Sequence, residues 1–130
     1  MIKVSLLVTA GPQRPGALTA LHTAQAVARS SHQPYRIFFY GDGVHLANRL
    51  ARRGEAVCDA QRGWQTLVAE HGWPASVCVG AALKRGISDG EEARRAGLEG
   101  GATLADGFTL VGLGDWVDAL TQSDRVVHFG

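Results

Sequence analysis

The sequence predicts an α/β fold, a three-layer α/β/α single domain with a mostly parallel sheet of about five strands. Short apolar runs alternate along the chain with segments whose apolar residues recur every three or four positions, the pattern of strands alternating with helices. The first run, residues 4–8, is apolar apart from Ser5, as in parallel strands covered on both faces. Because 130 residues, 45% of them hydrophobic, suffice for one core and not for two, we expect one domain over residues 1–130.

The next two predicted elements follow a loop that is rich in glycine and proline. Apolar residues that return every three or four positions over residues 17–30 give a helix one face for packing on the sheet. Residues 35–40 are aromatic and β-branched, which favours a strand. A glycine-containing turn ends this strand, and we expect Asp42 to cap a short helix there that runs to residue 50.

The middle of the chain is predicted to hold a surface loop, a helix and a third strand. Charged residues and a glycine over residues 52–55 indicate the loop. Asp59 is expected to cap the helix, and Gly72 to end it. The short apolar run over residues 76–79 then predicts the third strand.

The last part of the chain is predicted to hold two helices and one or two strands. Ser88 and Glu91 have the spacing of a capping box, which begins a helix. Residues Phe108–Val111 form either a fourth strand or an extended loop, and Arg125–Phe129 is the last strand. Four apolar residues between them share one face of a further helix: Leu113, Trp116, Val117 and Leu120.

Charge and composition exclude several classes of partner. A formal net charge of +1 provides no field that attracts nucleic acid or anionic lipid. No apolar run approaches the ~20 residues of a membrane-spanning helix, and the apolar start lacks a signal-peptide cleavage site. Two cysteines in no disulfide or zinc spacing suit a reducing compartment. We therefore expect a cytoplasmic protein with a protein or small-molecule partner, without direct contact to nucleic acid or membrane.

Ligands of parallel α/β sheets bind beyond the carboxyl ends of the strands, so the loops there are the candidate sites. Gly11 and Gly16 have the spacing of a phosphate-binding loop, but Ala17 and Leu18 stand where Lys and Ser or Thr would hold phosphate and magnesium, which excludes nucleotide hydrolysis. The candidate loops begin at Gly11, Gly41, Gly80 and Val111.

No metal or cofactor is predicted from the ligand-type residues. The five histidines have no ligand spacing with one another or with the cysteines. His45 alone follows the carboxyl end of a predicted strand, where it either assists proton transfer or is an ordinary first-turn helix residue. Glycines 112 and 114 lack the third glycine of a dinucleotide fingerprint. The architecture alone still leaves open a flavodoxin-like module that binds a nucleotide or flavin.

Cys78 is the candidate nucleophile, because it ends the third predicted strand and cations follow it at Lys84 and Arg85. A thiolate is the reactive form of cysteine, and nearby cations stabilise that anion. Gly80 leaves room for a partner's cysteine to approach. The alternative is that Cys78 is a small core residue, and the residues alone do not decide between the two. Cys58 has no neighbouring cation and is interpreted as incidental.

A series of short motifs runs in order over nearly the whole chain: Phe38-Phe39-Tyr40, Gly43-Val44, Asn48, Val77-Cys78-Val79, Ala81-Ala82-Leu83, Arg85-Gly86, Gly107-Phe108-Thr109-Leu110, Gly112-Leu113-Gly114, Asp124-Arg125-Val126-Val127 and Phe129. Together these motifs resemble those of one family, the DsrE/TusD family of sulfurtransferase subunits. The resemblance implies a DsrE-like fold and a persulfide carried on Cys78, without a cofactor. One departure is Val111, where the family often has a small polar residue.

The resemblance also implies partners and a pathway. TusC/DsrF-like and TusB/DsrH-like subunits are expected to complete a heterohexamer, a TusA-like protein to donate sulfur, and a TusE/DsrC-like protein to accept it. The expected pathway is 2-thiouridine synthesis at the tRNA wobble position. The alternatives are a DsrE subunit of the DsrEFH complex in dissimilatory sulfur oxidation and a non-catalytic structural subunit. If the subunit is catalytic, Lys84 and Arg85 are expected to stabilise the sulfur anion, and Gly80 is expected to shape the opening to Cys78.

Overall fold

Five parallel strands form one sheet, in the order β4-β3-β2-β1-β5. The computed structural model of the protein describes residues 1–51, 55–97 and 100–130, with the side chains of these except residues 55–59. The strands are β1 (Lys3–Val8), β2 (Gln33–Phe39), β3 (Ala75–Cys78), β4 (Phe108–Val111) and β5 (Arg125–Phe129). The predicted fold class is therefore confirmed, and residues Phe108–Val111 form a strand and not a loop.

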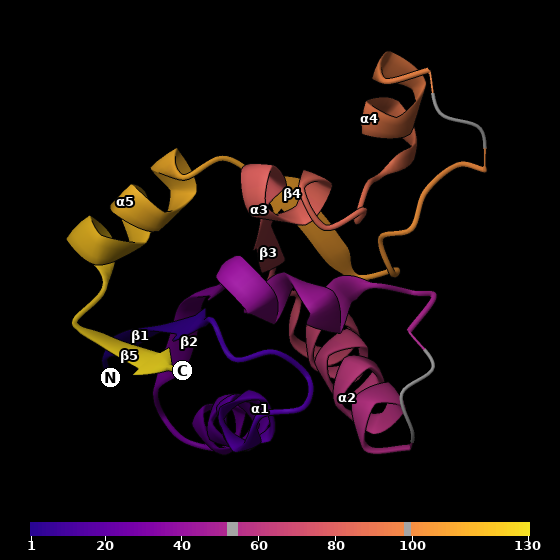
Figure 1. Ribbon diagram of the computed structural model, residues 1–130. Helices are drawn as coiled ribbons and strands as arrows, with labels where there is room; N and C mark the ends of the chain where they lie inside the picture. The colour runs from indigo at the N-terminus through magenta and orange to yellow at the C-terminus, as the bar shows by residue number, and fades with distance from the viewer. Residues whose placement is uncertain (52–54, 98–99) are drawn as a thin grey trace.

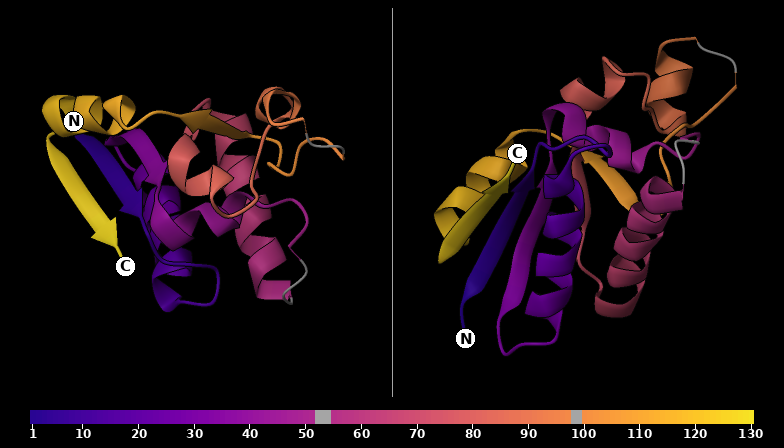
Figure 2. Two further views of the ribbon diagram at one scale, coloured as in Figure 1. Left: turned by 45° about the horizontal axis from the view of Figure 1, so that its top comes forward. Right: turned by 60° about the horizontal axis from the view of Figure 1, so that its bottom comes forward.

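Helices cover both faces of this sheet (Figure 1). Helices α1 (Pro15–Ala28) and α2 (Glu55–His71) lie on one face, and α5 (Gly114–Gln122) lies on the other, as Figure 2 shows in its right view. Beyond the carboxyl ends of the strands lie three short helices: η1 (Gly41–Ala47), α3 (Val79–Leu83) and α4 (Gly90–Arg95). The chain thus folds into three layers, with extra short helices at one end of the sheet.

Two helices begin earlier than predicted. Helix α1 begins at Pro15, because the first turn of a helix needs no backbone N–H donor and so accepts proline. Helix α2 begins at Glu55, so the predicted loop over residues 52–55 is wrong at Glu55, and residues 52–54 lie outside the described chain. Asp59 consequently lies inside α2 and does not cap it.

The predicted caps of two short helices are also wrong. Tyr40 is the N-cap residue of η1 and makes no side-chain cap, while Asp42 lies in the first turn. Asp89, and not Ser88, caps α4, since its Oδ1 accepts a hydrogen bond from the Glu92 N–H at 2.9 Å. The Ser88 hydroxyl instead donates to the carbonyl of Asp89 at 2.9 Å.

The main core lies between the sheet and the two long helices. Alternate residues of the strands point into it, such as Leu6, Val8 and Phe39, which are buried completely. Trp64 of α2 is also fully buried and meets the Phe39 ring edge-on, with ring centroids 5.1 Å apart. This packing fixes the end of β2, from which the chain turns into η1.

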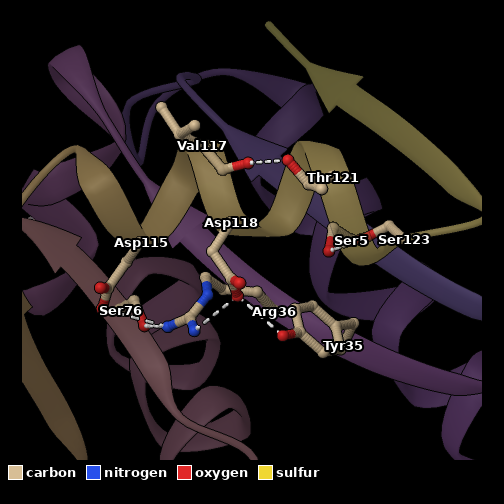
Figure 3. A network of polar contacts seen from close by, with 9 residues as sticks. All are labelled: Ser5, Tyr35, Arg36, Ser76, Asp115, Val117, Asp118, Thr121 and Ser123. Carbon is tan, nitrogen blue, oxygen red and sulfur yellow. Dashed lines mark hydrogen bonds and ion pairs between the residues drawn. The ribbon is translucent and has the colours of Figure 1, made fainter.

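The opposite face of the sheet is held to α5 by a polar network around Arg36 of β2 (Figure 3). The Arg36 guanidinium pairs with Asp115 at 3.3 Å and with Asp118 at 3.7 Å, both on α5. It also donates to the Ser76 hydroxyl of β3 at 3.3 Å, while the Tyr35 hydroxyl donates to Asp118 at 2.7 Å. The network therefore ties α5 to two adjacent strands of the sheet.

The predicted apolar face of α5 does not face the sheet as a unit. Trp116 packs on Phe38 of β2, with ring centroids 5.6 Å apart. Leu113, Val117 and Leu120, which form the exposed apolar row of α5, are 53%, 60% and 54% exposed. Because Asp115 and Asp118 must reach Arg36, the helix is rotated so that this row points away from the sheet. The spacing predicted that the four residues share a helical face, and it did not indicate what covers that face.

Tyr35→Phe is expected to make stability less sensitive to alkaline pH. The hydrogen bond to Asp118 and, to a lesser degree, desolvation and the Asp118 charge raise the pKa of Tyr35 above its ordinary value of 10.0, and Arg36 opposes this. A raised pKa in the folded state stabilises the protein below the unfolded pKa, and this contribution is lost as the pH rises through the folded pKa. The wild type should therefore lose its advantage over Tyr35→Phe above about pH 10.

Urea unfolding of the two proteins across this pH range measures the effect. Below about pH 9 the difference between the wild type and Tyr35→Phe should be constant, because the phenol is neutral in both states of the wild type. A difference that kept its size up to strongly alkaline pH would contradict the assigned hydrogen bond.

None of the helices within residues 1–51, 55–97 and 100–130 combines the length and apolarity that crossing a membrane requires.

Candidate functional site

Three neighbouring strands end at the same edge of the sheet and bring three of the predicted loops together. Strands β2, β3 and β4 are parallel and adjacent, so Tyr40, Cys78 and Val111 come at corresponding ends. The segments that follow these strands, namely η1, α3 and the residues after Val111, surround one open cavity of about 400 Å³. Its lining residues are Tyr40, Gly41, Cys78, Gly80, Ala81, Lys84, Arg85 and Leu113.

Cys78 lines this cavity and is nearly buried. It is the last residue of β3 and is 4% exposed, and α3 begins at the next residue. It is a free cysteine and does not belong to the apolar cluster between the sheet and α1 and α2. The side chain is therefore buried by its neighbours and yet borders open space, an arrangement in which a visiting group must enter the cavity to reach the sulfur.

Two cations from the end of α3 line the same cavity. Lys84 is the C-cap residue of α3 and is exposed. Arg85 follows it, and its guanidinium pairs with Asp42 of η1 through Nη2 and Oδ1 at 3.3 Å. Positive charge beside a sulfur atom favours an anionic sulfur, whether thiolate or persulfide. The cavity thus combines a cysteine, two cations and an opening.

Gly80 and His45 have different relations to this cavity. Gly80 is the second residue of α3 and not part of a turn, and a Cβ atom added there would meet no atom within 4 Å. His45 lies in a separate cavity of about 260 Å³, lined also by Gly11 to Arg14 and Asp42. The structure therefore places Lys84, Arg85 and Gly80 around Cys78, and His45 beside a neighbouring cavity.

The remaining sequence-predicted residues lie elsewhere or contribute no polar group. Val111 of β4 pairs with Cys78 of β3 in the sheet, so an apolar residue stands next to the cysteine on the neighbouring strand. Cys58 lies in α2, and its side chain is outside the described part of the chain. Over residues 1–51, 60–97 and 100–130, no three His, Cys, Asp or Glu side chains are grouped as a metal site.

Three residues of the site were missed from the sequence. Tyr40 is 42% exposed and Leu113 is 53% exposed, and both line the mouth of the cavity. Tyr40 could have been found because it ends the predicted strand over residues 35–40, at the edge of the sheet where the candidate loops begin. Asp42 was interpreted as a helix cap, and no local signal indicates its pairing with a residue 43 positions away.

Comparison with known proteins assigns the family. The DsrE/DsrF-like family matches residues 3–129. Sulfurtransferase TusD from Enterobacter sp. (strain 638) is 42% identical over 131 aligned positions, which cover 98% of this chain and all of that protein. The ychN protein from E. coli shares the fold, with a TM-score of 0.74, 20% identity and coverage of 99% of this chain and 100% of that one.

A second solved structure, the protein MTH1491 from Methanobacterium thermoautotrophicum, has a TM-score of 0.57 and 17% identity, with 98% of this chain and 99% of that chain covered. At these identities the solved structures support the fold alone. The family match and the 42% identical relative span nearly all of the chain, including the strand that ends in Cys78 and the helix that carries Lys84. The chain therefore belongs to the DsrE/DsrF-like family.

Proposed function

We propose that the protein is a sulfur-relay sulfurtransferase that accepts sulfane sulfur as a persulfide on Cys78 and passes it to a cysteine of an acceptor protein. The observation that carries the proposal is that the nearly buried Cys78 lines an open cavity together with Lys84 and Arg85. The 42% identity to a protein named sulfurtransferase TusD over the whole chain supports the same activity.

The proposed reaction needs no oxidant and no cofactor. The Cys78 thiolate attacks the outer sulfur of a donor persulfide, R–S–SH, so that a new S–S bond forms to Cys78 and the donor S–S bond breaks. The donor leaves as a thiolate, and Cys78 holds the sulfur with its proton as Cys–S–SH. In the second half an acceptor thiolate attacks that outer sulfur, and the Cys78 thiolate is regenerated. Each step conserves charge and the oxidation level of the moved sulfur.

Lys84 and Arg85 are proposed to stabilise the anionic sulfur in both halves. In each half of the reaction Cys78 is a thiolate at one end and a persulfide, which ionises readily, at the other. A cation beside the sulfur lowers the energy of each of these anions. The two side chains line the cavity with Cys78 and stand on the short segment that follows it. Gly80 has no side chain, and no atom lies within 4 Å of the position that a Cβ atom would take there. It is therefore proposed to keep that part of the cavity open.

The proposed partners are a TusA-like donor and a TusE/DsrC-like acceptor, in the relay that leads to 2-thiouridine in tRNA. The net charge of +1 agrees with a carrier that delivers sulfur to a protein and does not itself bind tRNA. A DsrE subunit in sulfur oxidation would use the same chemistry at Cys78. Genes for a sulfite reductase beside the gene for this protein would favour that second pathway.

The protein is further proposed to assemble with TusC/DsrF-like and TusB/DsrH-like subunits into a heterohexamer. Two exposed apolar features support an assembly. The row of Leu113, Val117 and Leu120 on α5 is more than half exposed. Strand β5 lies at the edge of the sheet, with Val126 and Val127 40% and 39% exposed. Exposed apolar rows and uncovered sheet edges are features that partner subunits cover.

Leu120→Glu is expected to weaken this association about 100-fold or more, because it would bury an unpaired carboxylate in the interface. Leu18→Glu on α1 is the matched control, since Leu18 is 43% exposed, against 54% for Leu120, and lies on the other face of the sheet. Co-expression of the three subunit types and gel filtration measure the effect. An equal loss of association in the two variants, or no loss of association in either, would contradict a role of the α5 row in assembly.

The proposed activity is tested by incubating the protein with a persulfide donor and mapping added sulfur by mass spectrometry of peptides. One added sulfur atom is expected on the peptide that contains Cys78, and its transfer to an acceptor thiol should return that peptide to its original mass. Added sulfur on Cys58, or on neither cysteine, would contradict the proposal. An ultraviolet-visible spectrum of the purified protein separately checks the flavin-binding alternative.

A further inference from the structure

The ion pair between Asp42 and Arg85 stands at the border between two cavities. Arg85 lines the cavity of Cys78, whereas Asp42 lines the neighbouring cavity with Gly11 and His45. The two residues come from different elements, η1 after β2 and the turn after α3. Their contact is therefore a connection between the ends of two adjacent strands, at the side of the reactive cysteine.

The backbone around Asp42 leaves this residue little freedom. Gly41 has φ of +55°, a left-handed conformation that favours glycine. A Cβ atom at Gly43 would overlap the carbonyl oxygen of Val8, so η1 lies directly against the end of β1. The same Val8 oxygen accepts a hydrogen bond from the Tyr40 N–H at 3.0 Å. Asp42 is thus fixed between two glycines whose conformation and packing are set by the sheet.

The Arg85 side chain is held at three of its atoms. Nε and Nη2 each lie 3.3 Å from Oδ1 of Asp42, and Nη1 donates to the carbonyl of Ala81 at 3.0 Å. The side chain is 30% exposed, against 69% for Asp42. An arginine at the end of a five-residue helix would otherwise sample many rotamers in solvent. The Ala81 carbonyl alone fixes only one end of the guanidinium.

We propose that Asp42 is a positioning residue that holds the Arg85 guanidinium at the cavity of Cys78. The inference deepens the proposed function, because a cation kept in place beside the sulfur is useful only if anionic sulfur forms there. Tyr40 and Lys84 also line this cavity, and the side-chain hydrogen bond and ion pair found for Asp42 within the described residues both go to Arg85. Asp42 therefore acts through Arg85 and does not itself touch the reacting sulfur.

The test compares Asp42→Asn with Asp42→Ala in the full-length protein. Both remove the carboxylate charge, but only asparagine keeps an oxygen that accepts a hydrogen bond from Arg85. The measurement is the ratio of two alkylation rates of Cys78, with anionic iodoacetate and with neutral iodoacetamide. The thiolate fraction cancels in this ratio, so the ratio reports the positive charge held beside the sulfur. Alkylation is followed on the Cys78 peptide by mass spectrometry.

The ratio is expected to be about two- to fivefold lower in Asp42→Ala than in Asp42→Asn. In an Arg85→Ala background the same two substitutions should give equal ratios, because nothing remains to be positioned. Equal ratios with Arg85 present would overturn the proposal, as would a difference that persists without Arg85. Urea midpoints of the variants confirm that folded proteins are compared.

Sulfur loading of the same variants separates this inference from the proposed function. If both hold, the rate of persulfide formation on Cys78 should also be lower in Asp42→Ala than in Asp42→Asn. A wild-type Cys78 that accepts no sulfur, together with the expected alkylation ratios, would refute the sulfur-carrier function and leave the positioning role supported. Normal loading with equal ratios in the two variants would refute the positioning role alone.

Discussion

Cys78→Ser is expected to reduce persulfide formation to below about one-hundredth of the wild-type rate, in keeping with the removal of other catalytic nucleophiles. A serine hydroxyl is not ionised near neutral pH, and it cannot hold sulfane sulfur as a persulfide. The substitution is nearly isosteric at a side chain that is 4% exposed, so the cavity and the fold should persist. The measurement is the initial rate of sulfur incorporation from a persulfide donor.

Cys58→Ser is the matched control for this prediction. It removes the other cysteine of the chain and leaves the cavity residues unchanged. We expect wild-type rates of loading in this variant, and unfolding midpoints close to wild type in both. Sulfur incorporation that persists in Cys78→Ser and disappears in Cys58→Ser would move the reaction to the other cysteine and refute the assignment.

Trp64→Ala is expected to lower the free energy of unfolding by about 3–5 kcal/mol, the usual cost of truncating a large buried aromatic residue. Trp64 is fully buried and packs edge-on against Phe39 of β2. Phe39 is followed directly by Tyr40 and Gly41, which line the cavity of Cys78. The space left by the truncated side chain should therefore also make the part of the Cys78 cavity that follows β2 more mobile. Urea unfolding followed by far-ultraviolet circular dichroism measures the loss.

Trp64→Phe distinguishes packing from hydrogen bonding at this position. The buried indole nitrogen of Trp64 has no hydrogen-bond partner among the described residues. Trp64→Phe therefore loses part of the packing and no hydrogen bond. It should lower the free energy of unfolding clearly less than Trp64→Ala does. A Trp64→Phe variant as unstable as Trp64→Ala would indicate that the indole nitrogen has a stabilising partner after all.

The strands and the place of the cysteine could be predicted from the sequence because their signals are local. A largely apolar run such as residues 4–8 is typical of a parallel strand covered on both faces, and four of these five residues are buried. Cys78 lies near the end of the short run over residues 76–79, which Gly80 follows, so its position near the end of a strand could be predicted. Parallel strands that share an edge then bring their loops together, whatever the strand order is.

The orientation of α5 and the role of Asp42 could not be predicted, because both depend on contacts between distant residues. Periodicity shows that Leu113, Val117 and Leu120 share a face, but it does not show whether the sheet or a partner covers that face. The direction is set by Arg36, which pairs with Asp115 at a sequence separation of 79. An aspartate after a strand has the same local signature as a helix cap or as an ion-pair partner.

The pairing of β1 with β5 bears on how the chain folds during synthesis. Two hydrogen bonds join Lys3 and Asp124 across a separation of 121 residues. The Asp124 N–H donates to the Lys3 carbonyl, and the Lys3 N–H donates to the Asp124 carboxylate. Strand β1 thus cannot complete this pairing until the much later β5 has been synthesised, and contacts between such distant segments form slowly. Until then β1 presents an open row of backbone donors and acceptors. Proteolytic loss of the final strand would recreate that row permanently and expose the protein to aggregation.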